Sequence, residues 1–249
     1  EGVIDSKNIK AQEYDLRINL AGLLQSDLKD IPVFEDLKFS GPAFVSLNLN
    51  GNPDSFKFEH QVDLTRADYQ IPVILEKRPN VLNKFKAKGS VLKNGGITIE
   101  KLGYELDENH ISGSIRIPDL DNPEFIINLE AENFQVEPTL HFFRLFNAEM
   151  DGIANFKITG SGNLNDIQKS KFAGEIELKK FKIRPKNFLS FLTVDADLKF
   201  QDNRLEVRSG NIKSDQSRLS FTGGYQGGDS PNLNLNLSGK KLDIDEIFP

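Results

Sequence analysis

The feature that most constrains the fold is a strict alternation of apolar and polar residues near the end of the sequence. The segment "NLNLNL" (232–237) sets Leu233, Leu235 and Leu237 against three asparagines. Successive side chains of a β-strand point to opposite faces, so one face of this segment is apolar and the other polar. The alternation predicts a strand that is buried on one side only.

The same phrase occurs twice more. "YDLRINLAG" and "PEFIINLEA" repeat the alternation, and the three copies close at Gly22, Ala131 and Gly239, which are 109 and 108 residues apart. Segments between the copies align at similar offsets. One of these alignments pairs His60 of the first repeat with Gly174 of the second. Self-similarity at a fixed period is the signature of tandem structural units.

Three parts are expected from this period. They are the tail of a preceding repeat in residues 1–40, a first whole repeat in 41–150 with a junction helix near 138–149, and a second whole repeat in 151–249.

Strand signals fill most of the remaining sequence. Alternating segments are found at 69–75, 111–117, 153–162, 172–183, 194–200 and 218–225, and turn-forming Gly, Asn and Asp lie between them. The short spacing between turns favours an antiparallel meander over βαβ units, which need long crossovers. Helical patterns are few and short, at 26–31, 138–149 and 185–192. We therefore expect an all-β chain of tandem antiparallel meanders with a few short helices.

Residues suited to catalysis or metal binding are scarce. His60, His110 and His141 are far apart, and there is no cysteine. Acidic pairs such as Asp195 and Asp197 alternate with apolar residues, which places them on the solvent face of a strand. We expect no catalytic residues, no metal site and no cofactor, so we expect that the protein is not an enzyme.

Composition and charge narrow the partners. The net charge is −6, and 31 basic residues are interspersed with 37 acidic ones, which argues against a nucleic-acid partner. No apolar run approaches the roughly 20 residues of a transmembrane helix. The first residues, "EGVIDSKN", resemble neither a signal peptide nor a natural start, so we expect a piece of a longer protein.

An antiparallel sheet with one apolar face must hide that face, and two solutions remain open. A sheet that closes into a sandwich or solenoid would make a scaffold or an adhesin-type binding module. A sheet that stays open and curls at glycines such as Gly160, Gly162, Gly174 and Gly223 would leave an apolar groove for a hydrophobic guest.

The order of four phrases resembles a known family. "ANFKITGSGNLND", "FAGEIELKKFKI", "VDADLKFQDNRLEVRSGNIKSDQSRLSFTGGY" and "PNLNLNLSGKKLDIDEIF" together look like the repeat region of the AsmA-like proteins of bacteria with two membranes. The resemblance covers residues 151–249 and extends more loosely over 41–138. AsmA-like proteins are in turn similar to the bridge-like lipid-transfer proteins of eukaryotes.

The resemblance implies a fold, a function and a location. It implies a strongly curved, groove-like β-sheet that shields phospholipid acyl chains in the periplasm, in a parent protein anchored in the inner membrane and supporting the outer membrane. Partners would be phospholipid or another acyl lipid, with membranes reached through other parts of the parent chain. The residues expected to line the groove are Phe156, Ile158, Ile176, Leu178, Val194, Ala196, Leu198, Phe200, Leu219, Phe221, Leu233, Leu235 and Leu237.

Overall fold

The protein was analysed as a computed structural model, which describes residues 2–3, 14–23, 38–52, 54–71, 75–93, 95–136, 148–185, 190–214, 216–228 and 230–241. Almost all of these residues lie in β-strands, and every strand pair with a described register is antiparallel. The predicted all-β class and the antiparallel meander are confirmed.

The chain divides into two compact units. Unit 1 comprises residues 1–128 and 161–170, and unit 2 comprises residues 129–160 and 171–249. These limits follow spatial contacts; the predicted repeat limits at 40 and 150 stay a prediction.

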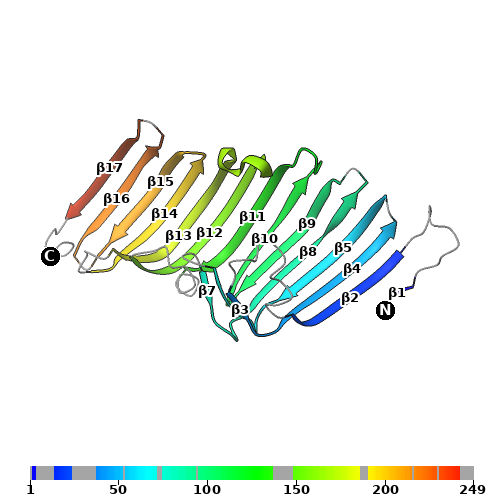
Figure 1. Cartoon of the computed structure of the whole chain (residues 1–249). Coiled ribbons are helices and arrows are strands. Elements are labelled where there is room, and N and C mark those ends of the chain that lie inside the picture. The colour runs from blue at the N-terminus through cyan, green and yellow to red at the C-terminus, as the bar shows by residue number, and fades with distance from the viewer. Residues whose placement is uncertain are drawn as a thin grey trace. The chain divides into compact units, whose positions relative to one another are not determined.

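Unit 1 contains the first ten strands and the beginning of the eleventh. They are β1 (Gly2–Val3), β2 (Tyr14–Leu23), β3 (Lys38–Ser40), β4 (Ala43–Asn52), β5 (Ser55–Asp63), β6 (Asp68–Ile71), β7 (Leu75–Lys77), β8 (Asn83–Leu92), β9 (Ile97–Leu106), β10 (Asn109–Ile117) and β11 (Glu124–Gln135). The hydrogen-bonding order of the larger sheet in this unit is β1-β2-β4-β5-β8-β9-β10-β11 (Figure 1).

A second, three-stranded sheet interrupts this meander between β5 and β8. Its order is β3-β6-β7, and it is built from the segment before β4 and the segment between β5 and β8. Two backbone hydrogen bonds tie the connection between β5 and β8 together, Leu64 N to Asn83 O and Asn80 N to Thr65 O, both 2.8 Å. We call this small sheet, together with residues 64–67, the cap.

Unit 2 contains the rest of β11 and the strands that follow it, apart from residues 161–163 at the end of β12, which belong to unit 1. They are β12 (Ala148–Asn163), β13 (Lys171–Pro185), β14 (Leu192–Gln201), β15 (Arg204–Lys213), β16 (Arg218–Gln226) and β17 (Asn232–Lys241), and their order is β11-β12-β13-β14-β15-β16-β17 (Figure 1). Each strand pairs with the next strand in the sequence, which is the order of a meander.

Two details differ from the sequence prediction. Residues 69–75, predicted as one strand, contain the end of β6 and the start of β7, which pair antiparallel with Ile71 opposite Leu75. The sequence has Pro72 between them, and proline cannot donate a ladder hydrogen bond. A short 3-10 helix at Leu164–Lys169, with Asn163 as its N-cap, was not predicted.

The predicted helices fall mostly outside the described residues. This applies to 26–31, to the junction helix apart from residues 148–149, which begin β12, and to 186–189 of the third helix. Residue 185 ends β13 and residue 192 begins β14.

Candidate functional site: an apolar sheet face

The register of unit 2 gathers apolar residues on one face of the sheet. Four rows cross β13, β14, β15, β16 and β17 in turn: Gly174, Phe200, Leu205, Tyr225, Leu233; Ile176, Leu198, Val207, Gly223, Leu235; Leu178, Ala196, Gly210, Phe221, Leu237; and Phe181, Val194, Ile212, Leu219, Gly239. Every member is apolar, apart from the Tyr225 hydroxyl, or is glycine. We call this surface the apolar face of unit 2.

Eleven of the thirteen residues predicted to line a groove belong to these rows. The other two, Phe156 and Ile158, lie on β12, where Asn155 points to the polar side and donates a hydrogen bond to Glu177 at 2.8 Å. Strand alternation places Phe156 and Ile158 on the opposite side, with Ile176. The ring of Phe156 also meets Phe134 of β11 edge-on, with centroids 5.6 Å apart.

Exposure of this face rises towards the last strand. Most side chains on the inner strands are half-buried, and Ala196 and Phe181 are buried. On β17 the leucines are largely open, with Leu233, Leu235 and Leu237 exposed by 68%, 46% and 56%. These three exposed leucines lie along one strand and together form an apolar patch. Exposed apolar residues that are scattered singly over a surface do not form such a patch.

The opposite face of unit 2 is polar and carries mixed charge. Lys199 lies between Glu175 and Glu206 in the register, and Arg208 donates a hydrogen bond to Glu175 at 2.8 Å. Ionic hydrogen bonding to Glu175 raises the pKa of Arg208, so this guanidinium stays charged. The predicted solvent position of Asp195 is confirmed, because its carboxylate accepts a hydrogen bond from the exposed backbone N–H of Lys180.

Unit 1 has an apolar face of the same kind. Three of its rows, crossing β2, β4, β5, β8, β9 and β10 in turn, are Leu20, Val45, Val62, Phe85, Tyr104, Ile111; Ile18, Leu47, His60, Ala87, Leu102, Gly113; and Leu16, Leu49, Phe58, Gly89, Ile99, Ile115. A fourth row runs from Tyr14 through Gly51, Phe56, Val91 and Ile97 to Ile117.

His60 is the one ionisable side chain other than Tyr104 and Tyr14 in these four rows. It lies between Leu47 and Ala87, and its ring meets Phe85 edge-on with centroids 6.4 Å apart. His60 therefore lies on the apolar face and is half-buried.

A fifth row of unit 1 lies under the cap and is fully buried. Asn83 is opposite Leu106, which is opposite Asn109, and Ala43 begins β4 at the same end. These four residues are exposed by only 1–5%, whereas the other rows of the unit are mostly half-buried. The cap thus covers one end of the apolar face of unit 1.

Hydrogen bonds hold the cap on this row. The Asn83 amide donates to the hydroxyl of Tyr69 on β6 at 2.8 Å and to the hydroxyl of Tyr104 on β9 at 3.3 Å. Burial raises the pKa of both tyrosines, which keeps both phenols protonated. The Asn83 amide thus joins the two hydroxyls, and Asn83 and Tyr69 are both buried.

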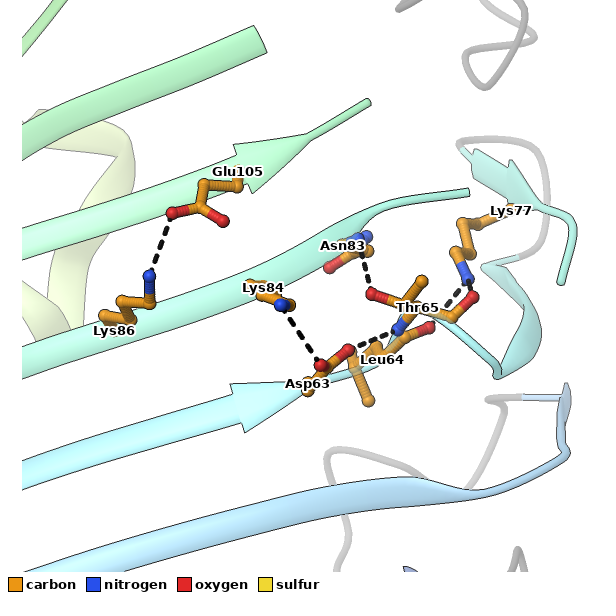
Figure 2. Close-up of polar contacts among 8 residues, drawn as sticks. All are labelled: Asp63, Leu64, Thr65, Lys77, Asn83, Lys84, Lys86 and Glu105. Atoms are coloured by element: carbon orange, nitrogen blue, oxygen red, sulfur yellow. Dashed lines mark hydrogen bonds and ion pairs between the residues drawn. The ribbon is translucent and has the colours of Figure 1, made fainter. Parts of the chain in front are cut away.

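A buried lysine joins β7 of the cap to residues 64–67. Lys77 of β7 is fully buried, and its ammonium donates to the carbonyl oxygens of Leu64, Thr65 and Ala67 at 2.6, 2.8 and 2.6 Å. Figure 2 shows this side chain reaching the turn at Leu64 and Thr65. Burial lowers the pKa of Lys77 to about 8, against the opposing charges of Asp68 and Asp63.

Asp63 links this turn to the sheet. Its carboxylate accepts a hydrogen bond from Thr65 N at 2.9 Å and lies 3.5 Å from the ammonium of Lys84 (Figure 2). Partial burial acts to raise the pKa of Asp63, but the contacts with Thr65 and Lys84 outweigh it and hold the pKa below its usual value.

The cap residues Tyr69 and Lys77 and the β8 residue Asn83 were not singled out from the sequence. Each acts through partners 10 to 21 residues away, and the alternation at 69–75 did not indicate these contacts. Such long-range contacts leave no periodic trace in the sequence.

The part of the chain that the structure describes contains no cluster of three or more His, Cys, Asp or Glu arranged for a metal ion. It also contains no helix with the length and hydropathy needed to cross a bilayer.

Comparison of the chain with protein-family models, with curated proteins and with solved structures gave no match.

Proposed function

We propose that this chain is a segment of a periplasmic lipid conduit, in which the apolar sheet face shields the acyl chains of phospholipid or another acyl lipid. The observation that carries the proposal is the continuous set of apolar rows in unit 2, ending in the exposed leucines of β17. An apolar surface of this extent is characteristic of contact with a hydrophobic partner.

The energetics suit an acyl chain. Each buried methylene contributes about 0.8 kcal/mol, so a chain of about 14 carbons would contribute roughly 11 kcal/mol before the costs of ordering and association. The mixed charge of the opposite face keeps that face in water. Transfer in this account is passive sliding of acyl chains along the rows, and the chain has no catalytic role.

The open strand order supports a groove over a closed sandwich or solenoid. Within the ranges that the structure covers, β17 has a hydrogen-bonded neighbour only in β16. Strong curvature of the sheet, which would deepen the face into a groove, belongs to this proposal, as do attachment of a parent protein to the inner membrane and a role in outer-membrane integrity. These last features are implied by the AsmA-like resemblance.

The proposal is tested by purifying the protein without detergent from a host with ordinary phospholipids, followed by native mass spectrometry and lipid extraction. We expect bound phospholipid or fatty acid at a reproducible ratio to protein. A lipid-free protein that also fails to take up lipid from added vesicles would contradict the proposal and favour a scaffold or an adhesin-type binding module.

A further inference from the structure

The cap makes the two ends of the strands in unit 1 different from each other. At one end the row of Ala43, Asn83, Leu106 and Asn109 is buried under β6 and β7. At the other end, the row through Phe56, Val91 and Ile97 is half-buried, with no cap residue bonded to it in the described structure. An elongated ligand lying along the strands would meet different surroundings at its two ends.

At the capped end, the buried side chains of Asn83 and Lys77 are already engaged in hydrogen bonds. The Asn83 amide is used by the hydroxyls of Tyr69 and Tyr104, and the Lys77 ammonium is used by three backbone carbonyls. A lipid headgroup placed there would lose its water without gaining hydrogen bonds, which is unfavourable. The methyl end of an acyl chain forms no hydrogen bonds with water, so it would lose none at the capped end.

We propose that the cap is the end wall of an acyl-chain site on unit 1, and that chains lie along the strands with their methyl ends against the cap and their polar ends at the opposite edge. This inference rests on the proposed lipid function and adds the orientation of the ligand. In unit 2 the sequence between β13 and β14 is only six residues long (186–191), too short for a small sheet like the one inserted between β5 and β8.

The chain has no cysteine, so single cysteines can carry a fluorescent label at chosen points. Val62→Cys lies in the row next to the cap, opposite Phe85, and Val91→Cys lies in the far row, opposite Ile97. Both are half-buried on the apolar face, and the change from valine is small. Arg116→Cys, an exposed position whose side chain alternates away from this face, is the matched control.

The probes are stearic acids that carry a nitroxide near the carboxyl or near the methyl end, because a nitroxide quenches a label only at short range. We expect the methyl-end probe to quench the Val62→Cys label at least about twofold more than the carboxyl-end probe, and the reverse order for Val91→Cys. Ile111→Cys and Ile117→Cys, at the capped and far ends of β10, repeat the comparison if the first pair folds poorly.

The outcomes separate the two proposals. Equal or reversed quenching by two probes that both bind would overturn the orientation and leave the lipid function standing. Absence of quenching at every labelled position of the apolar face, with no binding of either probe, would overturn the lipid function and the orientation together.

Discussion

The phenyl ring of Phe200 lies over Gly174, its partner across β13 and β14. A methyl group on Gly174 would lie 2.8 Å from this ring and 2.4 Å from the carbonyl oxygen of Lys157. The glycine is therefore required by the close approach of the ring and of the neighbouring strand. The predicted place of bending is, in the structure, a place of tight packing.

Gly174→Ala is expected to lower the free energy of unfolding by about 2 kcal/mol, because the ring or the backbone must move. Gly224→Ala on β16 is the matched control, since its methyl group would meet only Leu205 O, at 3.3 Å. Urea denaturation of both variants checks the prediction. Equal stability of the two variants would show that the ring does not need the glycine.

The buried ammonium of Lys77 is expected to matter far more than an exposed one. Lys77→Met removes the ammonium that donates to three carbonyl oxygens. Leu64 O and Thr65 O keep the backbone donors Ala67 N and Asn80 N, whereas Ala67 O loses this donor in a buried place, at a cost of about 2 kcal/mol. Lys93→Met removes an exposed pair with Asp54 and should cost no more than about 0.5 kcal/mol. Thermal or urea denaturation compares the two, and a small effect of Lys77→Met would contradict the role given to the cap.

Stability should also depend on pH through Lys77. Its pKa is about 8 in the folded protein and about 10.4 in an unfolded chain. Between these values the unfolded chain binds more protons, so the free energy of unfolding rises with pH. The raised pKa of Tyr69 acts in the opposite direction above about pH 10.

Urea denaturation between about pH 8 and 9.5 should therefore show a steeper rise of stability in the wild type than in Lys77→Met. Parallel pH profiles for the two proteins would mean that the lysine keeps an ordinary pKa in the folded state.

The Tyr69 hydroxyl and the Asn83 amide should be energetically coupled. Asn83→Leu removes a buried donor and leaves the Tyr69 hydroxyl without its amide partner, at an expected cost of about 2 kcal/mol. Adding Tyr69→Phe removes the hydroxyl that has lost its amide partner, so the double variant should be more stable than the sum of the single changes predicts. A double-mutant cycle measures this coupling, and additive effects would argue against the hydrogen bond.

The strands and their two faces could be predicted because alternation is a local pattern. Leu233, Leu235 and Leu237 fix the face of β17 by themselves, and the register then carries the same face to Phe221 and Ala196. The presence of the apolar face needed no tertiary information.

Alignment between the repeats was less secure, because a two-residue slip preserves alternation. The sequence alignment paired His60 of the first repeat with Gly174 of the second. In the structure His60 is opposite Ala87, and Leu178 is opposite Ala196. If Ala87 and Ala196 are equivalent positions of the two repeats, the equivalent of His60 is Leu178, one of the residues predicted to line the groove.

The cap could not be predicted for a different reason. Its contacts join Lys77 to a turn 10 to 13 residues earlier and Tyr69 to Asn83, and the alternation of a single strand does not show which distant segment it will contact. Burial of a lysine also runs against the usual distribution of that residue, so composition alone places Lys77 at the surface.

The central claim is that the apolar face binds acyl chains, and β17 offers the most direct test. Leu235→Asp and Asn234→Asp add the same charge at adjacent positions on opposite faces, opposite Gly223 and Gly224 respectively. The measurement is the affinity of each folded variant for a fluorescent fatty acid. We predict a loss of at least about tenfold, or about 1.4 kcal/mol, for Leu235→Asp and little change for Asn234→Asp. Equal affinities in the two variants would contradict binding at this face.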